Sequence, residues 1–389
     1  MSEKHSKPWF DPPAALNDGS KVAIIGGGIS GLMMASYLSK HFEITLIEEK
    51  KSIMAGASGN PAAILDPYIA LNQSIEKKFY LKAFEYAVDF YNTLPEDVFH
   101  KCGLLKLPKD KKEQRRFNKL SEQYPTTVMQ KTKEGLFFPN AGYINPKKLG
   151  AYLSNNFETL LNSKVTKITN SDKGKWILIH HPGNDRLLVD AVIICNSYNS
   201  KIFEQSNDLK FDEVSGQISY IKTEKVIDKI YCSDGYLTPA IEIENGYANI
   251  CGATFDRDDI KDINDISHQK NIQKSPIPLN SSKILGGRRE IRAMTNDHLP
   301  VCGALPKFNE YQRLYKDLHH GPNHKEFDTA SYHSGLYISA GLGSRGFLTA
   351  PLLSDYLTSL IRDCKKPIKS QIQHALHPAR FMIRKLSKK

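Results

Sequence analysis

Residues 21–49 read KVAIIGGGISGLMMASYLSKHFEITLIEE, and this stretch decides the fold. The apolar run 22–25 predicts a buried strand, the residues after it have helical spacing, and a second apolar run, 44–47, predicts a neighbouring strand. Glycines stand between the first strand and the helix, at Gly26, Gly28 and Gly31. An acid, Glu48, ends the second strand about 20 residues after the glycines, the spacing seen in dinucleotide-binding units.

Each of these positions has a physical task in binding a dinucleotide. Gly26 permits a tight turn from strand to helix, and Gly31 lets the helix pack closely on the strand. Gly28 lets the backbone at the start of the helix, at Ile29, approach a pyrophosphate whose charge the helix N-terminus stabilises. The carboxylate of Glu48 can accept hydrogen bonds from ribose hydroxyls. The alternative interpretation is a glycine-rich turn without a ligand.

A second glycine pattern indicates which dinucleotide binds. A predicted strand, 335–340, runs into Gly341-Leu-Gly-Ser-Arg-Gly346 and then into a predicted helix, 347–362. Two such units far apart in the chain can bracket one extended cofactor, and the second helix end favours negative charge on a flavin. We therefore prefer FAD over NAD, the alternative being an ordinary turn. The contacts expected from this loop are Gly341, Gly343, Ser344, Arg345, Gly346 and Phe347.

A small-residue loop, 55–61, follows the first unit and reads AGASGNP. Such a loop can pass close under a bound cofactor, because little side chain stands between its backbone and the ligand. We expect Ser58, Gly59 and Asn60 to line the flavin, with backbone N–H groups as the useful donors.

Composition describes a globular protein large enough for two domains. The chain has 389 residues, 40% of them hydrophobic, and six cysteines without a C-x-x-C pair, which argues for reduced thiols and against zinc. We expect a cytoplasmic protein with no membrane segment and no metal site, and a loose leader over 1–20. Three histidines lie in a polar segment that we interpret as an exposed insertion, namely His319, His320 and His324.

Positive charge is concentrated in two segments of a chain whose net charge is +11. Nine Lys or Arg residues and one acid lie between Arg362 and the end, which predicts a basic C-terminal tail over 365–389. A second cluster spans 109–116. Such clusters favour a polyanionic partner through counterion release at phosphates, whereas a merely solvated tail is the alternative.

The order of strand and helix patterns predicts an α/β fold with an interrupted Rossmann-like FAD-binding domain and a second, mainly antiparallel β substrate domain. The buried-strand pattern at 190–195 fits the parallel sheet begun by 22–25, whereas 211–255 reads as an antiparallel meander with turns at Gly216, Gly235 and Gly246. The expected FAD-binding domain comprises 21–95, 145–205 and 333–364. The expected substrate domain comprises 96–144 and 206–332.

Several of these segments together resemble the D-amino-acid-oxidase-like family of FAD oxidoreductases. The matching motifs are VAIIGGGISG at 22–31, GASGN at 56–60, RAMTNDHLPVCG at 292–303, GLGSRG at 341–346 and TAPL at 349–352. Within that family the chain is most similar to the FAD-dependent half of the bifunctional tRNA-modifying MnmC enzymes, and the similarity spans almost the whole chain.

The resemblance implies a reaction, a partner and a product. The expected substrate is 5-carboxymethylaminomethyl(-2-thio)uridine at the tRNA wobble position, which loses its carboxymethyl group as glyoxylate to leave 5-aminomethyluridine. The chemistry needs a cation to orient the carboxylate and a shape that places the methylene carbon over the flavin. Because the residues before Val22 are too few for the methyltransferase half, we expect this chain to produce the amine without methylating it. Either a separate methyltransferase acts on the amine, or the amine is the end point.

The resemblance also implies roles for site residues. Arg292 is expected to clamp the substrate carboxylate through its planar fork, with a surface ion pair as the alternative. Arg288 is expected to serve the same carboxylate or a tRNA phosphate. Arg345 is expected to contact the flavin or the substrate, or to hold its loop. His298 either accepts the amine proton or shapes a turn, and Val165 is expected on the adenine side.

Two other functions stay open at this point. A small-molecule amine oxidase acting on glycine, sarcosine or a D-amino acid shares the fold, FAD and the arginine clamp. A non-catalytic flavin-containing tRNA-binding protein is the second alternative, in which no substrate would reduce the flavin.

Overall fold

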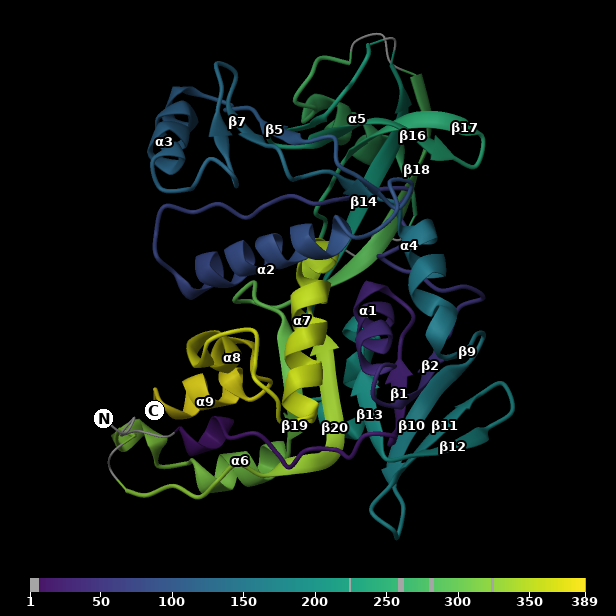
Figure 1. The fold of residues 1–389 in the computed structure, drawn as a ribbon, viewed down its shortest axis with the longest axis vertical. Helices are drawn as coiled ribbons and strands as arrows, with labels where there is room; N and C mark the ends of the chain where they lie inside the picture. Colours follow the sequence, from purple (N-terminus) through teal and green to yellow (C-terminus); the bar gives the residue numbers. More distant parts are fainter. Residues whose placement is uncertain (1–6, 224, 258–261, 280–282, 323–324, 389) are drawn as a thin grey trace.

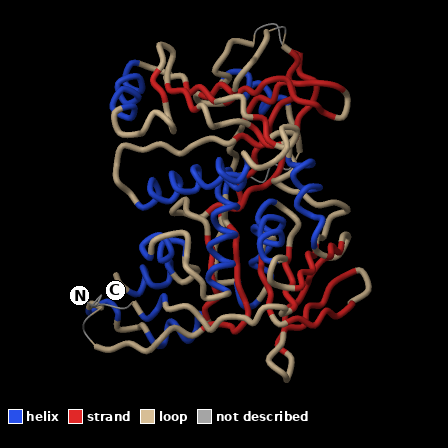
Figure 2. The backbone as a smooth tube through the Cα atoms, in the orientation of Figure 1, coloured by secondary structure: helices blue, strands red, loops and turns tan. Residues whose placement is uncertain are grey.

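The computed structural model describes residues 7–223, 225–257, 262–279, 283–322 and 325–388. Figure 1 shows two lobes: a mixed helix-and-strand lobe that holds both described chain ends, and a second lobe built mainly of strands. Figure 2 shows the same division, with most helices in the lobe of the chain ends. The predicted α/β fold with an interrupted nucleotide-binding sheet and a second antiparallel sheet is confirmed.

The first lobe is built on a six-stranded sheet with the order β19-β20-β13-β1-β2-β9. Its strands are β1 (Lys21–Ile25), β2 (Glu43–Ile47), β9 (Glu158–Leu160), β13 (Ala191–Ile194), β19 (Val301–Pro306) and β20 (Tyr332–Ala340). All neighbours pair in parallel except β19, which pairs antiparallel with β20. The continuous apolar runs of β1 and β13 form because both faces of this sheet are covered.

Helices cover one face of this sheet and a small sheet covers the other. Val22 and Ile24 of β1 pack against α1 (Ile29–Leu38) and α7 (Gly346–Ile361), while Ala23 and Ile25 belong to a separate cluster with Trp176. Trp176 begins the middle strand of an antiparallel three-stranded sheet, order β10-β11-β12. These strands are β10 (Lys164–Asn170), β11 (Trp176–His181) and β12 (Asp185–Val189).

The second lobe is an eight-stranded sheet with the order β18-β14-β17-β16-β15-β5-β7-β6. Its strands are β5 (Leu104–Lys106), β6 (Gln130–Lys131), β7 (Leu136–Phe138), β14 (Asp212–Lys222), β15 (Ile230–Cys232), β16 (Tyr236–Ile243), β17 (Gly246–Gly252) and β18 (Lys283–Met294). The predicted meander is confirmed in β15, β16, β17 and β14. Only β5 and β15 pair in parallel. The long antiparallel pair of β14 and β18 reaches from this lobe toward the first lobe, which we call the nucleotide lobe (Figure 1).

The remaining elements connect and cover these sheets. The helices are α2 (Ile75–Tyr91), α3 (Lys111–Ser121), α4 (Pro146–Leu153), α5 (Asp265–Gln273), α6 (Phe308–Leu314), α8 (Ser370–Leu376) and α9 (Arg380–Leu386). A second small sheet has the order β3-β8-β4, from Ala63–Ile64, Tyr143–Ile144 and Phe99–His100. Short 3-10 helices are η1 (Pro8–Phe10), η2 (Ser154–Asn156), η3 (Ser197–Ile202), η4 (Glu204–Ser206), η5 (Leu318–His320) and η6 (Gly343–Arg345).

The expected loose leader is wrong over the described residues 7–20. Trp9 is buried, and its ring meets Tyr315 edge-on at 5.8 Å between centroids. It packs in a cluster that also contains Ala379 and Ile383 from the other end of the chain. The leader is therefore part of the nucleotide lobe, because a large aromatic side chain gains more from burial than a disordered segment gains from chain entropy.

The expected basic tail is likewise a folded element. Ile372, Leu376, Ile383 and Leu386 are buried in α8 and α9, which lie against the nucleotide lobe. Arg380 is buried and paired with Asp297, its Nε lying 2.9 Å from the nearer carboxylate oxygen. The positive charge of this segment is therefore partly neutralised within the fold.

Two further expectations need correction. The edge strand β19 lies in the nucleotide sheet, although its residues fall within the predicted substrate range 206–332. The segment expected as an exposed histidine insertion buries Tyr311 and Tyr315, while His324 lies outside the described residues. The buried residues of β19 and the two tyrosines within the polar segment decide the packing. The other proposed domain boundaries stay predictions.

Candidate active site

A cavity of about 620 Å³ runs between the two lobes. Both glycine loops border it, together with the 56–60 loop, the 196–199 segment, β18 and the start of α3. The predicted residues on its wall are Gly26, Gly28, Ile29, Glu48, Ser58, Asn60, Val165, Arg292, Gly341, Gly343, Ser344, Arg345, Gly346 and Phe347. Segments distant in sequence thus meet in one elongated cavity within the size range of cofactor sites.

The first glycine loop has the geometry that its sequence predicts. Gly26 has φ +108°, and a Cβ there would lie 2.8 Å from the carbonyl oxygen of Cys195. A Cβ on Gly31 would overlap the carbonyl oxygen of Gly26, so Gly31 serves helix–strand packing behind the cavity wall. The backbone N–H of Ile29 donates to Ser58 Oγ at 3.0 Å, which ties the helix start to the small-residue loop.

Glu48 stands at the edge of the cavity with its carboxylate fixed by backbone donors. Its Oε2 accepts from the N–H of Gly27 at 2.6 Å, and its Oε1 accepts from the N–H of Lys50 at 2.8 Å. The side chain is buried, with 9% exposed. A carboxylate held in this way at the end of β2 has acceptor capacity left for a ribose hydroxyl pair.

Replacing Glu48 by Ala should lower FAD retention, because the ribose loses its acceptor and the first glycine loop loses the carboxylate bonded to Gly27. We expect FAD affinity to fall roughly tenfold or more, the cost of one or two charge-assisted hydrogen bonds. The measurement is flavin occupancy and dissociation constant after purification, with Glu43→Ala, at the exposed start of the same strand and away from the cavity wall, as the matched control. Equal occupancy in the two variants would remove Glu48 from the cofactor site.

Arg288 does not reach the cavity wall and instead holds the small-residue loop. Its Nη2 donates to the carbonyls of Ala55 and Gly56 at 2.8 and 2.7 Å, and its Nη1 donates to Asn60 Oδ1 at 3.0 Å. It also pairs with Glu290 at 3.0 Å. Both terminal nitrogens of Arg288 are thus tied to the loop or to Glu290, so this arrangement does not favour the expected contact with a carboxylate or phosphate, which stays a prediction.

Gly59, expected to line the flavin, lies behind that loop rather than on the cavity wall. A Cβ there would overlap the carbonyl oxygen of Met54, and the Arg288 Nη2 lies 3.1 Å from the same position. Gly59 is therefore a packing glycine, required by the close approach of two backbone segments.

The second glycine loop brings a cation to the cavity. Gly341 and Gly343 have φ +72° and +57°, and they turn the chain from β20 into α7. The guanidinium of Arg345 lies over the rings of Tyr68 and Tyr80, 5.4 and 5.5 Å from their centroids. Its Nε is buried without a hydrogen-bond partner in the described part of the chain. Arg345 is thus positioned by two aromatic faces with a donor to spare.

Arg292 places a guanidinium with a buried, unpartnered nitrogen on the cavity wall, as far as the described residues show. Its Nη1 is buried and has no hydrogen-bond partner among the described residues. Its guanidinium lies 4.7 Å from the ring centroid of Phe255. Burial lowers the pKa of this guanidinium from its ordinary value, against the opposing influence of Tyr236 and Asp256, and an arginine nevertheless remains charged in proteins.

The space for Arg292 comes from a glycine that sequence analysis assigned to a turn. Gly216 lies within β14, opposite Glu290 of β18, and a Cβ there would overlap the Arg292 guanidinium. The turn expectation for Gly216 is therefore wrong, since a strand glycine can also mark the close approach of a side chain. Tyr68, Tyr80, Tyr236 and Phe255, which also shape this region, carried no motif that could have identified them.

His298 lies outside the cavity wall, which favours the predicted turn over a direct role in proton transfer. It is exposed and has φ +59°, and its carbonyl accepts from the hydroxyl of Tyr80 at 2.5 Å. Its neighbour Asp297 points to the C-terminal helix, where it accepts from Arg380 and Arg384. The Asp-His-Leu-Pro segment therefore shapes a turn and anchors α9.

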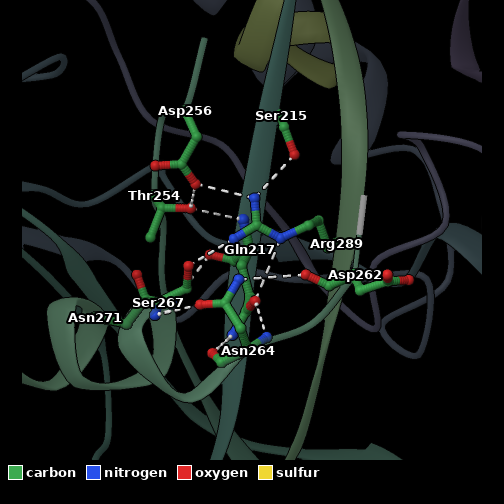
Figure 3. A network of polar contacts seen from close by, with 9 residues as sticks. All are labelled: Ser215, Gln217, Thr254, Asp256, Asp262, Asn264, Ser267, Asn271 and Arg289. Atoms are coloured by element: carbon green, nitrogen blue, oxygen red, sulfur yellow. Dashed lines mark hydrogen bonds and ion pairs between the residues drawn. The ribbon is translucent and has the colours of Figure 1, made fainter. Parts of the chain in front are cut away.

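Behind Arg292 lies a buried polar network centred on Arg289 (Figure 3). The guanidinium of Arg289 donates to Asp256 Oδ2 and Ser215 Oγ at 2.9 Å each, and to Ser267 Oγ at 2.5 Å. Asp256 follows Phe255 directly, so this network fixes the backbone that carries the ring beneath Arg292. Because strand side chains alternate, Arg289 faces α5 while Arg288 and Arg292 face the other side of β18.

The cavity has the features that an FAD molecule requires. Glycines at Gly26 and Gly28 leave backbone free at a helix N-terminus, where a Cβ on Gly28 would lie 3.2 Å from Ser58 Oγ. Glu48 ends β2 at the ribose position, and two cationic side chains with buried, unpaired nitrogen atoms stand farther along the wall. An extended, doubly anionic cofactor with a ring that gains charge on reduction fits this order of groups.

The chain belongs to the DAO family of FAD dependent oxidoreductases, whose family model matches residues 21–360. It is therefore an FAD-dependent oxidoreductase. The predicted cofactor is thereby confirmed.

Several curated relatives of this chain are named tRNA 5-methylaminomethyl-2-thiouridine biosynthesis bifunctional protein MnmC. The protein from Marinomonas sp. (strain MWYL1) is 29% identical, over 95% of this chain and 60% of that protein. The protein from Leptospira interrogans serogroup Icterohaemorrhagiae serovar copenhageni (strain Fiocruz L1-130) is 28% identical, over 100% of this chain and 64% of that protein. The chain thus spans less than two thirds of the length of these relatives.

Solved structures share the fold at lower identity. Glycine oxidase from Bacillus cereus ATCC 14579 superposes with a TM-score of 0.68 at 18% identity, covering 92% of this chain and 97% of its own. Iminodiacetate oxidase from Chelativorans sp. BNC1 superposes with a TM-score of 0.66 at 16% identity, covering 90% and 97%.

The helices and the metal-binding side chains of the described residues bear on two further expectations. None of the helices there is long and apolar enough to cross a membrane. Within the same ranges, no group of three or more His, Cys, Asp or Glu side chains is arranged to hold a metal ion.

Proposed function

We propose that this chain oxidises 5-carboxymethylaminomethyl(-2-thio)uridine at the wobble position of tRNA in the cytoplasm. The substrate is a secondary amine that carries CH2–COO⁻. It loses a hydride from its methylene carbon and a proton from nitrogen, and water then adds to the resulting C=N bond. The products are 5-aminomethyluridine and glyoxylate, and the new primary amine is the substrate class of an N-methyltransferase.

The observation that carries the proposal is the unpaired guanidinium of Arg292. A buried guanidinium nitrogen without a hydrogen-bond partner among the described residues is costly unless a ligand supplies an acceptor, and the planar fork matches a carboxylate. The ring of Phe255 and the packing space at Gly216 hold the fork in one orientation. A substrate with an N-carboxymethyl group therefore supplies what this part of the wall lacks.

The bound FAD supplies the hydride acceptor of the reaction. The residues of this chain bind and orient: Arg292 fixes the carboxylate, and Arg345 adds a second positive charge along the wall. Burial raises the pKa of Tyr80 to about 12 despite the nearby Arg345, so its hydroxyl stays neutral and keeps its bond to the His298 carbonyl. The reaction needs no protein nucleophile, because the amine nitrogen itself provides the electron pair.

The names of the MnmC relatives support tRNA as the substrate over a free amino acid. The positive charge of the chain supports the same choice, since a small zwitterionic amine gains nothing from cationic residues outside the cavity. A small-molecule amine oxidase remains the second candidate, favoured by the carboxylate clamp that both functions require.

The test is anaerobic mixing of the FAD-loaded protein with tRNA that carries 5-carboxymethylaminomethyluridine. We expect the visible absorbance of the oxidised flavin to bleach and glyoxylate to appear in equal amount. Unmodified tRNA and glycine serve as controls and should leave the spectrum unchanged. Bleaching by glycine alone would establish the small-molecule oxidase, and bleaching by none of the three would support a non-catalytic flavoprotein.

A further inference from the structure

A helix beside the substrate end of the cavity carries an unusual concentration of positive charge. The segment 106–121, which contains α3, has seven Lys or Arg residues and two acids. Arg116 and Phe117 of this helix belong to the cavity wall, as does Lys106 just before it. In Figure 1, α3 lies at the edge of the second lobe beside β7, away from α8 and α9.

One face of α3 is apolar and buried, and the opposite face is cationic and exposed. Phe117 and Leu120 are buried against the lobe. At 100° per residue the opposite face of the helix presents Lys111, Lys112, Arg115 and Lys119 within an arc of roughly a third of a turn. All four are exposed, and none has a hydrogen bond or ion pair from its side chain to a described residue.

The remaining charged residues of the segment hold the helix in place. Asp110 Oδ1 accepts from the N–H of Glu113 at 2.7 Å, and Glu113 Oε2 accepts from the N–H of Lys109 at 3.1 Å, which together cap the helix. Lys109 also pairs with Asp234, and Arg116 Nη2 donates to the carbonyl of Ile69 at 3.1 Å. The acids of the segment are thus used in capping and leave the exposed face uniformly positive.

We infer that this exposed face of α3, Lys111, Lys112, Arg115 and Lys119, is the surface on which the sugar–phosphate backbone of the tRNA substrate docks. The inference rests on the function proposed above. A row of unpaired cations suits a row of phosphates, and Arg116 joins this row to the cavity wall. A nucleotide whose neighbours lie on α3 is therefore presented at the entrance of the cavity that contains Arg292.

The C-terminal segment is a poorer candidate for the same contact. Arg362, Lys366, Arg380 and Arg384 already pair with acids of this chain. No residue of 362–388 lies on the cavity wall. The exposed Lys365, Lys385 and Lys388 have no recorded partner in the described ranges, so they form a matched control surface remote from the site.

The experiment compares Lys112→Gln/Arg115→Gln/Lys119→Gln with Lys365→Gln/Lys385→Gln/Lys388→Gln, both as FAD-loaded full chains. Glutamine removes the charge and keeps good helix propensity. Fluorescence anisotropy of labelled tRNA is measured over a salt series. For the α3 variant we expect affinity to fall roughly tenfold or more and the slope of log K against log salt to drop by about two. The control variant should match the wild type.

A kinetic measurement separates docking from chemistry. In the α3 variant kcat/KM for the modified tRNA should fall, while the rate with the free 5-carboxymethylaminomethyluridine nucleoside should stay at the wild-type value. Unchanged tRNA affinity in the α3 variant, or equal loss in both variants, would overturn the inference. If the wild type binds tRNA through α3 but oxidises none, the surface stands and the proposed reaction fails.

Discussion

Arg292→Ala should reduce kcat/KM for the carboxymethylated substrate at least about a hundredfold while leaving FAD bound, because misplacing the reacting carbon by an ångström costs that much. The alanine removes the guanidinium that lies over the ring of Phe255 on the cavity wall. Its loss leaves the substrate carboxylate without a bidentate partner in a buried place. Stopped-flow bleaching of the flavin under anaerobic conditions measures the effect directly.

The control for this prediction is Arg292→Lys. A lysine keeps the positive charge but not the planar fork or the stacking on Phe255, so we expect partial activity with a raised KM. Flavin content and absorbance should match the wild type in both variants. If Arg292→Ala oxidised the substrate at the wild-type rate, the carboxylate would have to bind elsewhere, and Arg345 would be the next residue to change.

Asp297→Asn should destabilise the protein by about 3 kcal/mol, because it leaves the buried guanidinium of Arg380 without its counter-charge. Arg380 has a side-chain exposure of 2% and Asp297 of 16%, and two of their hydrogen bonds measure 2.9 and 3.0 Å. The pair fastens α9 to the turn before β19. Urea unfolding of the FAD-loaded protein, followed by circular dichroism, measures the change.

The same residue predicts a pH dependence of stability. Burial alone would raise the pKa of Asp297, but Arg380 and Arg384 outweigh it and lower the pKa to about 2, from an ordinary value of 3.8. The contribution of this carboxylate is therefore complete above the unfolded value and is lost as the pH falls toward 2. The variant should show a flatter fall of stability with acid than the wild type.

Asp363→Asn provides the control for both measurements. Asp363 also pairs with a lysine, Lys366, but its side chain is 72% exposed, and surface pairs of this kind contribute little. If Asp297→Asn unfolded at the same urea concentration as Asp363→Asn, the Asp297–Arg380 pair would not be what holds α9.

Local patterns in the sequence predicted the nucleotide lobe well. The βαβ unit around Gly26 is contiguous, and its glycines, helix and final acid constrain one another within thirty residues or so. The second glycine loop at Gly341 was equally visible, since it lies between a continuous apolar strand and an apolar helix. These features depend on backbone conformation, which neighbouring residues largely determine.

Contacts between distant residues limited the rest of the prediction. Arg288, Arg289 and Arg292 look alike in sequence, yet one holds the small-residue loop, one lies in a buried network and one faces the cavity. Strand alternation separates Arg289 from the other two. Only the fold shows that the guanidinium of Arg288 donates hydrogen bonds to the loop at 55–60. Net charge alone also misjudged the C-terminal segment, because the partner of Arg380 lies 83 residues earlier at Asp297.

An amphipathic pattern could have corrected that last error. Ile372, Leu376, Ala379, Ile383 and Leu386 recur at helical spacing among the lysines and arginines, and all of them are buried. A segment with this pattern is expected to pack on a core rather than extend into solvent. The number of charges in this segment does not indicate α8 and α9, whereas the spacing of its apolar residues does.

The unpaired nitrogen of Arg292 places a local cost on the folded state. The two faces of β18 make opposite arrangements: Arg289 satisfies its guanidinium within the protein, whereas Arg292 leaves a donor vacant inside a buried wall. An apolar residue of similar length at position 292 would relieve that cost and give a more stable, inactive molecule. In the proposed reaction, the substrate carboxylate would pair with this nitrogen, so substrate binding would recover a cost that the folded protein carries alone.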